Sequence, residues 1–201
     1  MALNVNYTKG VVICHGKSEV CLAKYIYTNL HLPVKQYSKN NGKNSIQITS
    51  LKTLLNTSPF NTINNFISEY EIETSGKGKK RVLCNFKLFL IMDTDDCTEQ
   101  QRTDYINKEL FKGHWLYDYI VPVYNIANLE EVMVKSGIMA KKIKIDEKGD
   151  YYEKIFPINS RPLSNDTLNE VNTFNEKVKK VKTTNLECFV DYCLSLLETI
   201  K

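Results

Sequence analysis

The sequence predicts an α/β fold: a Rossmann-like, mostly parallel sheet of four to five strands, followed by a C-terminal helical extension. Between residues 10 and 136, short apolar runs that suit buried strands alternate with segments whose apolar residues are spaced for one helical face. Such alternation builds a parallel sheet with helices on its faces. The 201 residues, 42% hydrophobic and 25% charged, match one globular domain in size and composition.

The elements of the first half alternate in order. Val11 to Cys14 is a β-branched run typical of a buried strand. Ser18 is the expected N-cap of the next helix, which ends before Pro33. Further strands are predicted at 34–37 and, from an alternating pattern, at 45–49, with helices at 50–55 and 61–70.

The second half contains the strongest strand signal, at 81–92, preceded by a flexible basic loop at 74–80. Thr98 is expected to begin a helix, and Asn128 to cap another that Gly137 closes. Residues 139–163 are charged and irregular, with a turn at 146–150. Other elements are a strand at 119–124 and helices at 165–181 and 185–199. We therefore expect an α/β core at 1–138 and a helical extension at 139–201 that packs on it.

Apolar runs in the chain are short. The longest, such as 88–92, fall far below the roughly 20 residues of a membrane span. The N-terminus has no apolar stretch of signal-peptide length, and none of the six cysteines forms a CxxC pair or a zinc-like spacing with histidine. We expect a cytoplasmic protein with reduced thiols and no membrane partner.

Charge is unevenly distributed along the chain. Residues 1–96 carry 12 Lys and Arg against 7 Asp and Glu, whereas residues 97–201 carry 15 against 16. Glu19 is the only acid before Glu69. A basic half with isolated acids is typical of a surface that binds a polyanion around a metal site. The alternative is simple drift in a composition rich in Lys and Asn.

Two polar motifs follow predicted strands. His15-Gly16-Lys17-Ser18-Glu19 comes directly after the first strand, and Asp93-Thr94-Asp95-Asp96 comes directly after the strongest one. Functional groups of an open parallel sheet collect at the carboxyl ends of its strands, so both motifs are expected at one edge. Carboxylates such as Asp93, Asp95 and Glu19 are the ligands that Mg²⁺ prefers. The positive end of the first helix, with Lys17, favours an anion nearby.

This arrangement resembles the TOPRIM domain of topoisomerases, primases, OLD-family nucleases and RloB-like proteins of phage-defence loci. VVICHGKSE is similar to the family's first motif, where a strand leads into Glu-Gly and a helix, and FLIMDTD to its second, a strand ending in Asp-x-Asp. NLEEVM is similar to an acidic helix start of RloB-like members. The resemblance covers about residues 10–136 and departs at one position, where His15 stands in place of the motif glutamate.

The resemblance implies phosphodiester hydrolysis with Mg²⁺ or Mn²⁺. Asp93 and Asp95 would hold one cation and Glu19 a second, with His15 as proton donor or acceptor. Lys17 would neutralise developing charge. Lysines of the two basic loops would contact nucleic acid, DNA or RNA; they are Lys43, Lys77, Lys79 and Lys80. A small TOPRIM protein also often works beside a protein partner such as an ATPase subunit.

Structural interpretations compete with each functional one. The DTDD motif is also typical of a polar turn that caps a helix. Glu19 is also explained as an acid in the first turn of a helix, where it interacts favourably with the helix dipole, and His15 as a turn residue. The lysine loops also suit solvated surface. Two other functions stay open: a TOPRIM-like subunit that binds without cleaving, and a phosphohydrolase, because haloacid-dehalogenase phosphatases also end a strand in Asp-x-Asp, although on their first strand.

Overall fold

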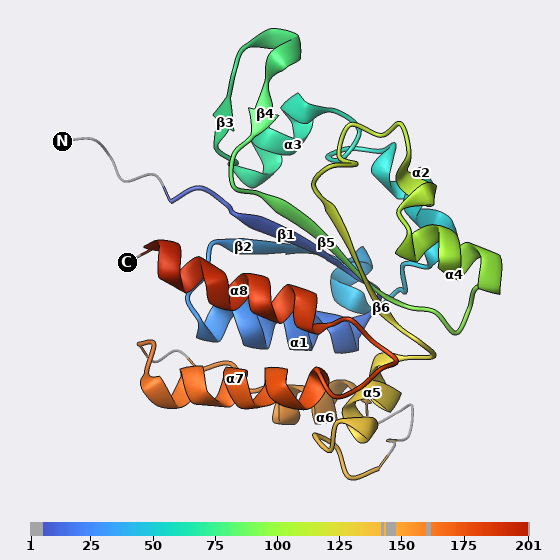
Figure 1. Cartoon of the computed structure of the whole chain (residues 1–201), viewed down its shortest axis with the longest axis vertical. Helices are drawn as coiled ribbons and strands as arrows, with labels where there is room; N and C mark the ends of the chain where they lie inside the picture. The colour runs from blue at the N-terminus through green and yellow to red at the C-terminus, as the bar shows by residue number, and fades with distance from the viewer. Residues whose placement is uncertain (1–5, 142, 144–147, 160–161, 201) are drawn as a thin grey trace.

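A computed structural model describes residues 6–141, 143, 148–159 and 162–200. Its centre is a parallel four-stranded sheet of order β2-β1-β5-β6, so the predicted α/β fold is confirmed (Figure 1). The strands are β1 (Gly10–Cys14), β2 (Val34–Tyr37), β5 (Lys87–Asp93) and β6 (Ile120–Asn125). The helices are α1 (Lys17–Asn29), α2 (Leu51–Leu55), α3 (Ile63–Tyr70), α4 (Glu99–Ile106), α5 (Leu129–Lys135), α6 (Lys148–Ile155), α7 (Asn165–Val178) and α8 (Glu187–Ile200).

The strand order creates one switch point in the sheet. From β1 the chain passes through α1 to β2 on one side, and later reaches β5 on the other side. The carboxyl ends of β1 and β5 therefore flank the crevice where open α/β sheets bind ligands. Pairing aligns Cys14 with Ile91, and Asp93 with Asn125.

Both faces of the sheet are covered by helices. Alternating strand residues point to opposite sides, so Val12, Phe89 and Ile91 belong to one buried cluster. Their neighbours Val11 and Leu88 belong to another. The first cluster includes buried residues of α1, α5, α6, α7 and α8, and the second those of α2, α3 and α4. None of the helices in the described part of the chain is long and apolar enough to cross a membrane.

Several local predictions are wrong. Residues 45–49 form an irregular segment and a 3-10 turn instead of a strand, although Ile46 and Ile48 are buried as their alternation suggests. The predicted strand 81–92 is two strands, because Asn85 has a φ of 47° and breaks the chain direction. Its first part, β4 (Val82–Leu83), pairs antiparallel with β3 (Thr74–Ser75), so the predicted basic loop is a hairpin.

The region assigned as irregular contains a helix. Residues 148–155 form α6, and the predicted turn at 146–150 overlaps its first turn; 146 and 147 lie outside the described residues. The caps of two helices are as predicted, since Thr98 accepts a hydrogen bond from Gln101 N and Asn128 accepts one from Glu131 N. The start of α1 differs, because Gly16 and not Ser18 is its N-cap.

Tyr105 of α4 forms hydrogen bonds with two strands from the face of the sheet that α2, α3 and α4 cover. It is fully buried, and its hydroxyl lies 2.5 Å from the Leu90 carbonyl oxygen on β5 and 3.1 Å from that of Val123 on β6. We expect Tyr105→Phe to lower the free energy of unfolding by about 1–3 kcal/mol, because it leaves buried carbonyl oxygens without their donor. Urea unfolding would measure this, and Tyr7→Phe, at a residue 36% exposed, should change little.

Candidate functional site

The two polar motifs meet at the carboxyl edge of the sheet, as predicted. His15 follows the last residue of β1, and its backbone N–H donates to the Ile91 carbonyl oxygen of β5 at 2.9 Å. Asp93 is the last residue of β5 and pairs with Asn125, the last of β6. Parallel pairing across the switch point thus places one polar side chain at the end of each central strand.

Asp93 is held in a fixed position within the protein. Its side chain is buried, and Oδ1 accepts hydrogen bonds from Asn125 Nδ2 at 3.0 Å and from Leu129 N, at the start of α5, at 2.9 Å. Burial raises the pKa of the Asp93 carboxyl well above its ordinary value, and the Glu19 carboxylate raises it further. The hydrogen bond from Asn125 acts in the opposite direction.

Glu19 lies in the first turn of α1 and is 2% exposed. Its Oε2 accepts a hydrogen bond from Gly16 N at 2.8 Å, so this carboxylate caps the helix in place of Ser18. The structural interpretation of Glu19 as a first-turn acid is therefore correct. Its charge also acts on Asp93, which means that two buried carboxylates of like charge lie within electrostatic range of each other.

His15 is oriented by the irregular segment that follows β2. Its backbone carbonyl accepts from Ile46 N at 2.8 Å, and its ring Nδ1 lies 2.9 Å from the Ile46 carbonyl oxygen. Because a carbonyl oxygen only accepts, Nδ1 carries the hydrogen and Nε2 of the neutral ring keeps a lone pair. The histidine thus offers a proton acceptor beside the carboxylates, and its charged form lowers the pKa of Asp93.

A left-handed loop fits against the start of α1. Asn40, Asn41 and Gly42 have φ values of 50°, 56° and 82°. A Cβ atom on Gly42 would lie 2.8 Å from Lys17 Cα and 2.9 Å from Lys17 N. The glycine is therefore required both by its backbone conformation and by its close approach to the helix.

We expect Gly42→Ala to lower the free energy of unfolding by about 2 kcal/mol, because the added methyl group meets rigid backbone. Gly113→Ala is the matched control, since Gly113 has nearly the same φ, 81°, with nothing within 4 Å of the added Cβ. Thermal unfolding of both variants would measure the difference. Equal losses would show that the close approach to Lys17 contributes nothing.

The remaining predicted residues lie further from the centre of the site. Asp95 is exposed in the turn after β5, though near enough to raise the pKa of Asp93. Lys17 forms an ion pair with Glu153 of α6 at 2.7 Å between Nζ and Oε1. Lys43 is exposed on the segment beside the left-handed loop, at the same edge.

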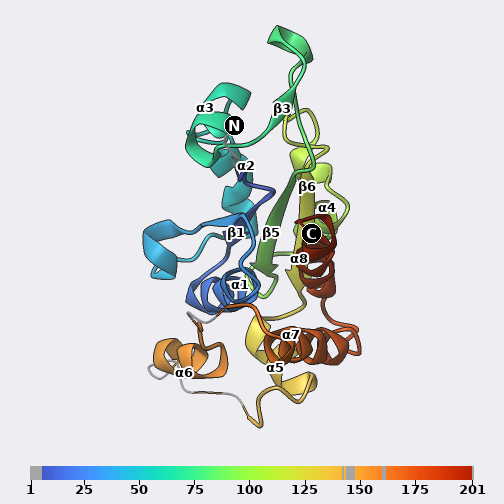
Figure 2. The same cartoon turned by 90° about the vertical axis from the view of Figure 1, so that its left-hand side faces the viewer.

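The lysines of the second basic loop do not join this site. Lys77 and Lys80 belong to the β3–β4 hairpin, which lies at the opposite end of the molecule from α5 and α6 (Figures 1 and 2). Their contact with nucleic acid stays a prediction, at a surface away from Asp93. The side chain of Lys79 lies outside the described residues.

Two further buried polar residues follow the ends of β5 and β6 and were not predicted as site residues. Glu130 of α5, within the acidic NLEEVM segment, is buried and accepts a hydrogen bond from Ile143 N. Thr94 is 3% exposed, and its hydroxyl makes no hydrogen bond within the described structure. Both left a signal in the sequence, because Thr94 lies within the motif after the strongest strand and Glu130 follows the predicted cap Asn128.

The donor set suits a hard cation held by few protein ligands. Among the described residues, no three His, Cys, Asp or Glu side chains are grouped as a complete metal site. Mg²⁺, however, keeps most of its waters and usually takes one or two carboxylates from the protein. Asp93 and Glu19 supply such a pair.

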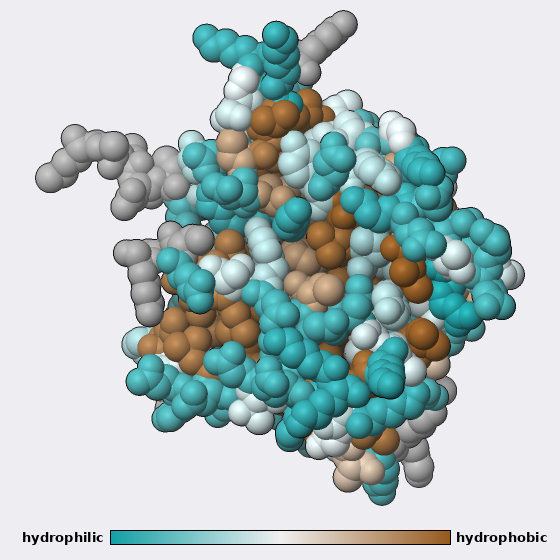
Figure 3. All heavy atoms as spheres, viewed as in Figure 1, coloured by the Kyte–Doolittle hydropathy of each residue, from teal (hydrophilic) through white to brown (hydrophobic). Residues whose placement is uncertain are grey.

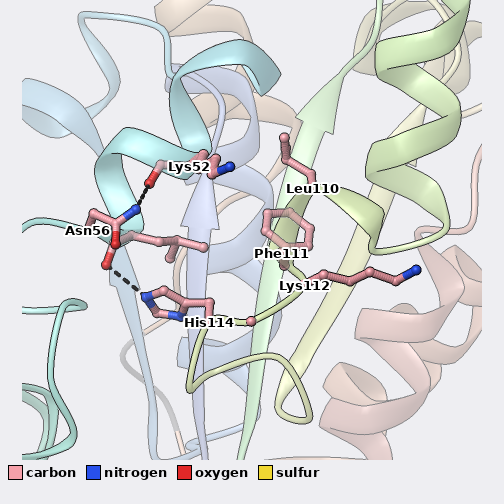
Figure 4. Close-up of a pocket in the computed structure, with 8 residues that line it drawn as sticks. Lys52, Asn56, Leu110, Phe111, Lys112 and His114 are labelled. Carbon is pink, nitrogen blue, oxygen red and sulfur yellow. Dashed lines mark hydrogen bonds between the residues drawn. The ribbon is translucent and has the colours of Figure 1, made fainter.

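Two hollows of the surface lie away from this edge. One of about 230 Å³ lies between α2 and the turn before β6, where His114 Nε2 donates to the Leu55 carbonyl oxygen (Figure 4). Another, of about 740 Å³, lies between α8 and the start of β5, where apolar residues reach the surface (Figure 3). Neither includes a predicted site residue, whereas a third hollow, of about 270 Å³, is lined by Lys17 together with Glu153 and Phe156.

Comparison of the chain with protein-family models, with curated proteins and with solved structures finds no match in any of the three.

Proposed function

We propose that the carboxyl edge binds a divalent cation, Mg²⁺ or Mn²⁺, and that the protein is a TOPRIM-like nuclease which hydrolyses phosphodiester bonds in DNA or RNA. The observation that supports this most is the pair of buried carboxylates, Asp93 and Glu19, at the switch point of the sheet. Carboxylates are the ligands that Mg²⁺ prefers, and few of them suffice because this cation keeps most of its waters.

Asp93 and Glu19 would hold the cation, with Asp95 at the rim. The cation would polarise a phosphate group and stabilise the leaving oxygen. His15 offers Nε2 to take a proton from an attacking water, and the hydrogen bond to Ile46 keeps the ring oriented for that transfer. The start of α1 and Lys43 add positive charge on the side where a phosphate would lie.

A second candidate is a TOPRIM-like subunit that binds nucleic acid or a partner protein without cleaving. Two observations favour it. Glu19 Oε2 is already used to cap α1, and Asp93 Oδ1 accepts two hydrogen bonds. A site with these oxygens occupied has fewer lone pairs for a cation, as expected where His15 has replaced a metal-binding acid.

Cleavage of labelled single- and double-stranded DNA and RNA, with Mg²⁺ or Mn²⁺, separates these functions. Metal-dependent cleavage that is lost in Asp93→Asn and kept in Asp96→Asn, an exposed acid of the same turn, supports the nuclease. Binding without cleavage supports the second candidate. Release of phosphate from a small ester, with no action on nucleic acid, would instead support a phosphohydrolase.

A further inference from the structure

Asn125, at the end of β6, has a buried amide group bonded at both ends. The residue is 0% exposed. Its Nδ2 donates to Asp93 Oδ1 at 3.0 Å, and its Oδ1 accepts from the Thr184 hydroxyl at 2.9 Å. The amide therefore has one orientation, because the opposite one would place its oxygen against the Asp93 carboxylate.

Thr184 determines which end of that amide faces Asp93. It is 6% exposed, and its hydroxyl oxygen accepts a hydrogen bond from Leu186 N at 3.1 Å. The hydroxyl hydrogen is thus left to donate, and only the amide oxygen of Asn125 can accept it. The hydrogen bonds form a relay in one direction, in which Leu186 N–H donates to Thr184, Thr184 to Asn125 and Asn125 to Asp93.

The segment that carries Thr184 leads into α8 and lies along the edge of β6 (Figure 1). Thr184 and Asn125 form an antiparallel bridge, and Ile126 N donates to the Thr183 carbonyl oxygen at 2.7 Å. The side chain of Asn185 also bonds to the backbone of β6. Contacts on both sides of Thr184 therefore fix the position of its hydroxyl.

The relay leaves one carboxylate oxygen of Asp93 available. Oδ1 accepts two hydrogen bonds, from Asn125 Nδ2 and Leu129 N, and these fix the direction of the carboxylate. Within the part of the chain that the structure describes, Oδ2 accepts no hydrogen bond and is not fully buried. Oδ2 is therefore the oxygen of Asp93 that a ligand can reach.

We propose that Asn125 and Thr184 are positioning residues of the carboxyl-edge site, and that their relay holds the Asp93 carboxylate with Oδ2 presented to the divalent cation. Removal of a group that orients a metal ligand typically lowers metal affinity by about 10- to 100-fold. The inference rests on the proposed function, because it needs a cation at Asp93. It gives the C-terminal extension a part in the site through residues that do not touch the ligand.

Thr184→Val tests the proposal, because valine keeps the shape of threonine and removes the hydroxyl. Thr184→Ser keeps the hydroxyl and is the rescue variant. The matched control is Thr183→Val at the neighbouring residue, whose hydroxyl makes no hydrogen bond within the described structure. Circular dichroism and the melting temperature would show that each variant is folded before binding is measured.

Calorimetric titration of the metal-free proteins with Mn²⁺ measures the affinity. We expect Thr184→Val to lose about 10- to 100-fold in Mn²⁺ affinity, and Thr184→Ser and Thr183→Val to stay within about twofold of the native protein. Native affinity in Thr184→Val overturns the proposal. An equal loss in Thr184→Ser also overturns it, because the effect would then belong to packing of the methyl group.

A variant with a weaker donor covers the case in which Thr184→Val does not fold. In Thr184→Cys the donor is a thiol, so its Mn²⁺ affinity should lie below that of Thr184→Ser, and equal affinities overturn the proposal. If the native protein binds no Mn²⁺, the proposed function fails and the relay fails with it. If the native protein binds Mn²⁺ and the variants at residue 184 bind it equally well, only the relay is overturned.

Discussion

A chain that ends at residue 138 is expected not to fold. Of the 29 buried residues in the cluster on the α1 face of the sheet, 12 lie in residues 139–196. Each large apolar side chain contributes about 1.5–3 kcal/mol when buried, whereas a whole domain is stable by about 5–15 kcal/mol. Removal of the extension would therefore cost more free energy than the net stability of the folded chain.

Specific contacts tie the extension to the sheet. The ring of Phe189 on α8 lies 5.2 Å from that of Phe89 on β5, and the Tyr192 hydroxyl donates to the Lys9 carbonyl oxygen at 2.6 Å. Asn185 covers the open edge of β6, because its side chain accepts from Tyr124 N and donates to the Pro122 carbonyl oxygen. These contacts explain why we expect the stability of the sheet to depend on residues of the C-terminal extension.

Circular dichroism and urea unfolding of the 1–138 chain would measure this expectation. A cooperative unfolding transition of that fragment would contradict it and would make residues 139–201 a separate unit. In the full chain, Phe189→Ala should cost about 3–5 kcal/mol. Cys188→Ala, at an exposed neighbour, should cost almost nothing and serves as the control.

The sequence predicts the order of the main elements because the central strands are continuous apolar runs. The run from Leu88 to Met92 is buried along its whole length, and the polar motifs after β1 and β5 meet because parallel strands share one carboxyl edge. The break at Asn85 was missed, since left-handed backbone at an asparagine has no clear sequence pattern. The hairpin that results is short and depends on tertiary packing.

The site was predicted only where its residues are close to strand ends. Helix α6 is not predicted because it lies in a charged segment and is held by Phe156 and by the ion pair of Glu153, both long-range contacts. The pairing of Ile46 with His15 is likewise tertiary, and it uses an irregular segment whose alternating pattern suggested a strand. Local sequence therefore located the carboxylates but not the groups that surround them.

Asp93→Asn is expected to abolish cleavage and, in the absence of metal, to stabilise the protein. Asparagine keeps an oxygen for the hydrogen bonds from Asn125 and Leu129 N but removes a buried charge that faces Glu19. The loss of a cation ligand is worth several kcal/mol in the transition state, which corresponds to a roughly 10³-fold fall in rate. Asp96→Asn, in the exposed part of the same turn, should change neither property.

The pH dependence of stability follows from the raised pKa of Asp93. An acid whose pKa is higher in the folded than in the unfolded chain stabilises the fold while it is protonated, and that stability is lost as pH rises through the folded-state pKa. In metal-free buffer near pH 8, the free energy of unfolding of Asp93→Asn should therefore be about 1 kcal/mol higher than that of the native protein. The difference should vanish below about pH 4, the ordinary range of an aspartate pKa.

Added Mg²⁺ should reverse that order at pH 8. A cation that binds the folded chain raises its melting temperature in proportion to the logarithm of its concentration above Kd, and only the native protein keeps both carboxylates. Thermal unfolding of the two proteins over a series of Mg²⁺ concentrations would measure the crossover. Equal shifts in native protein and Asp93→Asn would place the cation elsewhere, and a lower stability of Asp93→Asn at every pH would mean that the Asp93 charge is compensated within the protein itself.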